Sequence, residues 1–311
     1  MRPITRTLKT DHLHKVPYSS DRRRCSADRL SSMGTQPERT TSVAATFNAA
    51  APTYDAPSQD FFRVLAAEVI RRVVPEPDAT VLDVPCGTGH AIGELLRVLG
   101  PDGRVTGIDI SPAMAEIAAA KVEREGSGRA TVSVGDFRSL PIDDGSVDLA
   151  LCVFGIFFVP DMAAGLAELW RVVAPGGRLI VVTWAPGLFD PLRLVFYGTA
   201  HELRPDLVPE APGAKITPTA TEDGMAGLVS AAGIDVTPSF TPIPHTHPLA
   251  DRSTWWEIVM GAGWRSVVDA MTPDEARQLR EACDAAVAAG PVTSVRCDAL
   301  MTVIARPALE R

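Results

Sequence analysis

The sequence has few cysteines, no long hydrophobic run and few basic residues in its main part. Its five cysteines are spread over 311 residues without a CxxC spacing, so neither a disulfide framework nor a zinc site is predicted. The longest apolar run, 150–159, has about half of the roughly 20 residues that a helix needs to cross a bilayer. We therefore predict a protein of the reducing cytoplasm, with no metal site and no membrane span.

Basic charge is concentrated in residues 1–40, which carry nine Lys and Arg against four Asp and Glu. Residues 41–311 have 21 basic and 34 acidic side chains, a balance that repels phosphate backbones and disfavours nucleic acid as a partner. Residues 1–40 are also polar and lack a hydrophobic period, which predicts a disordered tail. Met33 leaves open whether residues 1–32 belong to the native protein.

The middle of the chain alternates between two hydrophobic periods. An amphipathic helix is predicted over 60–74. Short apolar strands then alternate with helical patterns, the strands at 80–84, 104–109, 131–134, 146–153 and 178–183 and the helices at 91–99, 112–124 and 162–172. Such alternation builds a mostly parallel sheet with helices on both faces, so we predict a Rossmann-like α/β fold.

The regular alternation of strand and helix patterns ends after residue 184. A strand is predicted over 233–240, helices over 254–268 and 273–289, and a last strand over 295–305. This stretch is longer than a connection between two strands needs, so part of it is expected to cover the active site. We predict a single domain over 41–311, with an N-terminal helical lid at 41–75 and a substrate-cap insertion within 185–296.

The first predicted strand runs into a loop with two glycines, Gly87 and Gly89, and then a helix. Without a Cβ, glycine lets backbone N–H groups approach a nucleotide-like ligand closely. Asp109 ends the next strand 20 residues after Gly89, where a carboxylate can accept hydrogen bonds from both ribose hydroxyls. The alternative for Asp109, capping the next helix, suits Ser111 better.

The third strand is followed by Asp136 and Phe137. The carboxylate of Asp136 can accept a hydrogen bond from an adenine amino group while Phe137 packs near the ring. An aspartate in a turn beside a core phenylalanine is the alternative interpretation.

Four segments occur together in order, VLDVPCGTG (81–89), GIDIS (107–111), GDFRSLPIDDGSVDLALCVFGIFFVPD (135–161) and LWRVVAPGGRLIVVTW (169–184). This combination resembles the class I S-adenosylmethionine-dependent methyltransferases, in particular the small-molecule, ubiquinone/menaquinone-biosynthesis-like (type 11) group. The resemblance covers about 44–184. It implies a seven-stranded sheet whose last strand is antiparallel and inserted beside the sixth. It also implies S-adenosyl-L-methionine as the cofactor, bound across the carboxyl ends of the first, second and fourth strands.

The resemblance also implies a set of cofactor-binding residues. Asp83 would reach the methionine ammonium and Asp109 the ribose, and Phe47 with Tyr54 matches an FNxxAxxYD element that folds over the cofactor. Pro85 stands where glycine or alanine is commoner. The full set comprises Tyr54, Asp83, Pro85, Cys86, Gly87, Gly89, Asp109, Ile110, Met114, Asp136, Phe137, Cys152 and Val153.

A sulfonium methyl group is already electrophilic, so the protein mainly has to position an acceptor and exclude water. No catalytic residue is identified; the candidates are Tyr54, which can orient an acceptor, and His245 and His247, for which an ordinary polar loop is the alternative. We predict methyl transfer to an oxygen, nitrogen or carbon atom of a small metabolite under a lid. The alternative is an S-adenosylmethionine-binding protein that transfers no methyl group, and a homodimer is left open.

Overall fold

The computed structural model describes residues 36–208, 217–249, 254–262, 264–290 and 292–309. Gln36–Arg311 forms one compact unit. Its first helix, α1 (Gln36–Ala50), begins five residues before the predicted start of the domain. The rest of the predicted tail lies outside the described residues.

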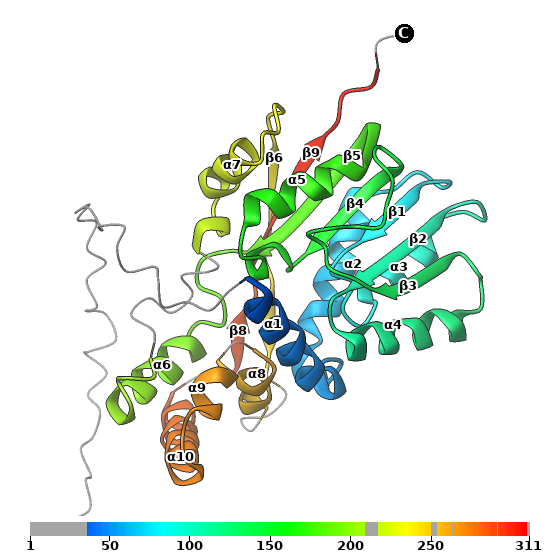
Figure 1. The fold of residues 1–311 in the computed structure, drawn as a ribbon. Helices are drawn as coiled ribbons and strands as arrows, with labels where there is room; N and C mark the ends of the chain where they lie inside the picture. Colours follow the sequence, from blue (N-terminus) through cyan, green and yellow to red (C-terminus); the bar gives the residue numbers. More distant parts are fainter. Residues whose placement is uncertain (1–35, 209–216, 250–253, 263, 291, 310–311) are drawn as a thin grey trace, which may run out of the picture. The chain divides into compact units, whose positions relative to one another are not determined.

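A seven-stranded sheet in the order β3-β2-β1-β4-β5-β9-β6 forms the centre of the fold (Figure 1). The first five strands pair in parallel, whereas β9 is antiparallel to both of its neighbours. This confirms the predicted topology, including the last strand inserted beside the sixth. The strands are β1 (Thr80–Asp83), β2 (Arg104–Asp109), β3 (Ala130–Val134), β4 (Val147–Val153), β5 (Val173–Trp184), β6 (Ser239–Ile243) and β9 (Ala299–Ala305).

Two groups of helices cover the sheet. One contains α2 (Phe61–Val73), α3 (His90–Val98) and α4 (Pro112–Glu125), and the other contains α5 (Met162–Val172) and α7 (Glu222–Ala231). The bounds of α4 follow from its sequence. The Ser111 side chain accepts the Met114 N–H at its start, and Gly126 ends it with φ +73°, a conformation that glycine adopts without strain.

Three predicted elements beyond residue 184 have different bounds. The strand expected at 233–240 is observed as β6, which begins only after Pro238 and continues to Ile243. The helix expected at 254–268 is divided into α8 (Trp255–Gly261) and α9 (Arg265–Asp269). The last strand is divided because β8 (Ser294–Arg296) pairs with β7 (Thr246–Pro248) in a separate small sheet before the chain enters β9.

The predicted cap region contributes a cluster of helices away from α3, α4 and α5 (Figure 1). In it α6 (Leu192–Leu203) packs against α10 (Pro273–Ala289), and α8 packs against the short 3₁₀ turn Pro57–Gln59. Segments from both ends of the chain therefore meet there. None of the helices in the described ranges is long and apolar enough to cross a membrane.

Candidate active site

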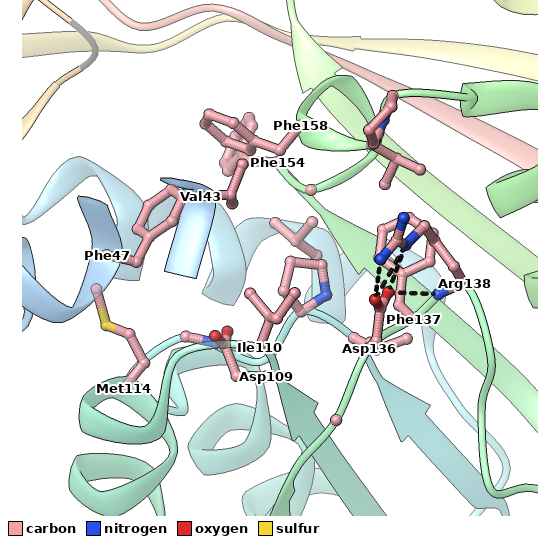
Figure 2. A pocket seen from close by; sticks show the side chains of 18 of the residues that line it. Val43, Phe47, Asp109, Ile110, Met114, Asp136, Phe137, Arg138, Phe154 and Phe158 are labelled. Carbon is pink, nitrogen blue, oxygen red and sulfur yellow. Dashed lines mark hydrogen bonds and ion pairs between the residues drawn. The ribbon is translucent and has the colours of Figure 1, made fainter. Parts of the chain in front are cut away.

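A pocket of about 760 Å³, partly open to solvent, lies where β1, β2 and β4 end. Because these strands are parallel, their carboxyl ends meet at one edge of the sheet, the usual ligand site of such folds. Figure 2 shows the side chains of α1, of the β2 end and of the loop after β4 around this space. The pocket is therefore formed by the sheet and by the N-terminal segment together.

Nine of the thirteen predicted cofactor residues line this pocket. They are Tyr54, Pro85, Gly87, Asp109, Ile110, Met114, Asp136, Phe137 and Val153. The other four, Asp83, Cys86, Gly89 and Cys152, are buried outside its lining.

Asp109 presents an oriented carboxylate to the pocket from the end of β2. Its Oδ1 accepts the Ser111 N–H and its Oδ2 accepts the Gly87 N–H, each at 2.8 Å. Burial raises the pKa of Asp109, and hydrogen bonds from the Ser111, Gly87 and Ile110 backbone oppose that rise. A carboxylate has about four lone-pair sites, so each oxygen keeps capacity for a further donor.

Gly87 gives the glycine loop its shape. Its φ is +54°, in the left-handed region that favours glycine, and a Cβ there would lie 3.9 Å from the Tyr54 ring. The turn of the loop at Gly87 is what aims its N–H at Asp109.

Asp83, at the end of β1, is 1% exposed, and neither of its oxygens has a hydrogen-bond partner among the described residues. Burial first, and then the nearby charge of Asp109, raises the pKa of Asp83 to about 8. A buried carboxyl without a partner is costly, and a cationic group placed beside it would relieve that cost. Asp83 thus fits the neighbourhood of an ammonium group even though it does not line the pocket.

The remaining three predicted residues pack the structure beneath the pocket. Gly89 lies where α3 meets α4, and a Cβ there would be 3.2 Å from the Ala118 side chain. Cys86 belongs to the glycine loop and its side chain packs against Gly107 of β2, and Cys152 is fully buried in β4. Burial raises the pKa of both thiols, so neither is a ready thiolate.

Pro85 has a matching partner that the sequence analysis missed. A Cβ on Gly155, in the loop after β4, would overlap the Pro85 ring. Only glycine fits there while proline occupies position 85. A proline in the first loop facing a glycine in the fourth is a pairing that only spatial proximity reveals.

At the other end of the pocket Asp136 is held by Arg138, which the sequence analysis did not single out. The Arg138 guanidinium Nε lies 3.0 Å from Oδ1 and 2.9 Å from Oδ2 of Asp136, and the Arg138 backbone N–H donates to Oδ1 at 3.0 Å. Burial would raise the pKa of Asp136, but the hydrogen bonds and the charge of Arg138 outweigh it and hold the pKa below its usual value. Asp136 is therefore ionised and oriented, with Phe137 buried next to it (Figure 2).

Aromatic side chains form much of the remaining wall. Phe154 lines the pocket, stacks on Trp184 with ring centroids 3.8 Å apart, and has φ +56°, an uncommon conformation for a bulky residue. Phe47 of α1 meets Phe158 edge-to-face at 5.0 Å, which joins the N-terminal segment to the loop after β4. The apolar run at 150–159 signalled burial, but not that two of its phenylalanines face a pocket.

The candidate catalytic residues are divided between two places. Tyr54 lines the pocket, where burial and then the charges of Asp109 and Asp55 raise the pKa of its hydroxyl, so it stays protonated. His245 and His247 lie at β7 and do not line the pocket.

The rings of His247 and Phe61 pack edge-to-face with their centroids 5.2 Å apart. The backbone N–H of His245 donates a hydrogen bond to the Asp298 carboxylate. Burial lowers the pKa of both histidines, so they are neutral near pH 7. The structure does not bring them to the pocket. Within the described ranges no group of three or more His, Cys, Asp or Glu side chains is arranged to hold a metal ion.

Comparison with known proteins agrees with this geometry. The model of a family described as "Methyltransferase domain" matches residues 81–177, which span β1 to the first part of β5. The chain carries a class I S-adenosylmethionine-dependent methyltransferase domain. Its similarity to demethylmenaquinone methyltransferases agrees with the resemblance to the ubiquinone/menaquinone-biosynthesis-like group, and its cofactor is S-adenosylmethionine.

Two curated relatives show how far the similarity extends. Nocamycin O-methyltransferase of Saccharothrix syringae is 28% identical over 84% of this chain and 98% of its own length. Demethylmenaquinone methyltransferase of Lactococcus lactis is 34% identical, but over only 37% of this chain and 46% of its own length. The first match therefore extends over most of this chain, whereas the second covers little more than a third of it.

The solved structure of the cyclase SpnF has a TM-score of 0.52 with this chain and 17% identity, covering 87% of this chain and 97% of its own. At that identity the likeness shows the fold alone.

Proposed function

We propose that this methyltransferase transfers the methyl group of S-adenosylmethionine to an oxygen, nitrogen or carbon atom of a small metabolite. Oxygen is the favoured acceptor atom, because the relative that is matched over almost its whole length is named an O-methyltransferase. A bound sulfonium supplies the electrophilic methyl group; the protein holds it, aligns the acceptor and excludes water.

Asp109 is the observation that carries the proposal. Its two oxygens are each fixed by one backbone N–H and face the pocket, an arrangement suited to the two neighbouring hydroxyls of a ribose. We assign Ile110 and Met114 to the walls beside the adenine, and Asp136 with Phe137 to its edge.

We assign Asp83 to the methionine end. The desolvated carboxyl below the glycine loop is suited to a cationic amino group, reached directly or through water. Val153 and the loop that begins with Pro85 would surround that end of the cofactor.

The acceptor would approach along the aromatic wall of Tyr54, Phe154 and Phe158, which favours an apolar or flat molecule. Tyr54 keeps its proton, so it would orient an acceptor by donating a hydrogen bond rather than act as a general base. The N-terminal segment and 185–296 would together form the lid and cap. A homodimer and a cytoplasmic location remain predictions.

A second candidate keeps cofactor binding without methyl transfer. It is favoured by one finding, that the same fold is found in a protein named a cyclase. Two experiments separate the candidates. Titration calorimetry with S-adenosylhomocysteine tests binding, and no binding would refute both. Transfer of an isotope-labelled methyl group to a small-molecule product supports the first candidate, and binding without any labelled product across a panel of hydroxylated metabolites would favour the second.

A further inference from the structure

The residue after Tyr54 makes contacts that the methyl-transfer proposal does not use. The Asp55 carboxylate accepts the Thr88 hydroxyl at 2.6 Å and lies 3.0 Å from His90 Nε2 and 2.6 Å from Lys121 Nζ. Thr88 lies between the two glycines of the loop, His90 begins α3, and Lys121 belongs to α4. We call these three contacts the Asp55 latch.

The latch is buried at one end and partly exposed at the other. Thr88 is fully buried, whereas the side chains of Lys121 and Asp55 are 31% and 38% exposed. Burial would raise the pKa of Asp55, but hydrogen bonds from Lys121 and Thr88 outweigh it and hold the pKa below its usual value. Burial, then Lys121, lowers the pKa of His90, so its imidazole meets Asp55 as a neutral donor. Hydrogen bonds to a charged group in such a setting are stronger than neutral ones.

A second polar contact holds the same segment against α4. Asn48 Oδ1 accepts the Ser111 hydroxyl at 2.7 Å and the Ala113 N–H at 3.2 Å, at the start of α4. Between the two contacts Ala50 and Ala51 pack on Met114. Phe47 and Tyr54, which immediately precede the two anchors, line the pocket. The FNxxAxxYD element thus alternates aromatic pocket residues with polar anchors.

We propose that Asp55 is a positioning residue that ties closure of the N-terminal segment to the conformation of the glycine loop. The inference rests on the proposed cofactor site, because the loop that Thr88 belongs to is the one assigned to the methionine end. The same Thr88 hydroxyl that fixes the loop between Gly87 and Gly89 also fixes the residue next to Tyr54. Movement of the glycine loop therefore strains the N-terminal segment, and movement of the segment strains the loop. Tyr54 lies over the pocket only when the loop is in its binding conformation.

The cofactor-free protein provides the first test. Amide hydrogen exchange of residues 43–55 is measured in the wild type, in Asp55→Asn and in the control Asp60→Asn. Asp60 is matched in chemistry and lies five residues away, but it pairs with Arg63 on its own helix. Asp55→Asn is expected to speed exchange of 43–55 on the order of tenfold, and the control to leave it unchanged. Equal exchange in the wild type and Asp55→Asn would overturn the latch.

A second variant, Lys121→Met, distinguishes loss of the latch from a local folding defect of the N-terminal segment. It removes one contact of Asp55 from the α4 side without changing the N-terminal segment itself. It should speed the same amides by a smaller factor, and Asp55→Glu, which keeps the charge, should recover part of the protection. If Lys121→Met leaves 43–55 as in the wild type, the latch is overturned. Exchange in β1 and β4 is expected to be unchanged in all variants.

S-adenosylhomocysteine then separates the latch from the proposed function. With wild-type protein it should bind and further protect 43–55; Asp55→Asn should bind on the order of tenfold more weakly and gain little protection, whereas Asp60→Asn should behave as wild type. Wild-type binding with unchanged affinity and protection in Asp55→Asn would overturn the latch alone. Failure of the wild type to bind would overturn the proposed function and the latch with it.

Discussion

Polar side chains have different roles in two regions, the strand ends and loops within 81–160 and the cap region at 185–296. In the first, Asp109 and Asp136 end up at a pocket with their oxygens oriented by neighbouring N–H groups. In the second, His247 is used in packing, edge-on to Phe61, and Trp255 is buried with its indole N–H bonded to Asp284. Parallel strands deliver their ends to one place whatever follows them, whereas the residues of an irregular connection go where packing takes them.

Removing the central carboxylate of the first region should have the largest effect. Asp109→Asn keeps the shape but loses the charge that two hydroxyls and two N–H groups share, so we expect S-adenosylhomocysteine to bind on the order of a hundredfold more weakly. Calorimetry measures this. The control Asp148→Asn changes a carboxylate that accepts the Thr80 N–H beside the start of β1, and should bind as wild type. A loss shared by both variants would show a general defect of the sheet.

The desolvated carboxyl of Asp83 predicts a pH dependence. Burial raises its pKa to about 8, so without cofactor it is protonated at pH 7, and pairing with an ammonium group would make it release that proton. Affinity for S-adenosylhomocysteine should therefore rise with pH, by up to about tenfold per unit from pH 6 to 8, and level off above. Asp83→Asn should bind weakly with a flat profile. A flat wild-type profile would contradict the assignment of Asp83 to the ammonium.

The same pKa has a consequence for stability. Because the folded-state pKa of Asp83 lies above the unfolded value, Asp83 should contribute a loss of stability to the cofactor-free protein as pH rises from about 4 through 8. Asp83→Asn should reduce that loss. Urea unfolding at several pH values measures it.

The fit of Pro85 against Gly155 can be broken and restored. Gly155→Ala places a Cβ on the proline ring and should lower the free energy of unfolding by about 1–3 kcal/mol, with loss of cofactor binding. Pro85→Ala combined with Gly155→Ala should recover most of both. If the double variant is no better than the single one, the strain lies elsewhere in the loop.

The smallest effect is expected in the cap region. Because His245 and His247 lie away from the pocket, His245→Gln and His247→Gln should change the rate of methyl transfer by less than about threefold. The pH dependence of kcat should also stay as in the wild type. A larger fall in kcat, with binding of S-adenosylhomocysteine unchanged, would mean that the acceptor reaches β7 and would remove the contrast between the two regions.

Much of the pocket could be predicted because it is encoded locally. Gly87, Asp109 and Asp136 each lie at or just after the end of a strand, and their role depends only on where that strand ends. Arg138 also lay within reach of the sequence, since a basic residue two positions after Asp136 can turn back to it. The position of Phe154 at the pocket could not be predicted from the sequence, because it depends on stacking against Trp184 and on an unusual φ.

The sequence by itself determined the order and type of the strands and helices up to residue 184, and with them the edge at which the ligand site forms. Hydrophobic period and glycine placement act over a few residues, so they are legible without a structure. Only the tertiary structure decided that Asp83 is sealed off, that Gly155 accommodates Pro85, and that Asp55 joins the N-terminal segment to the glycine loop. Those contacts join residues far apart in the chain, and their free energy exists only once the sheet and its helices have brought them together.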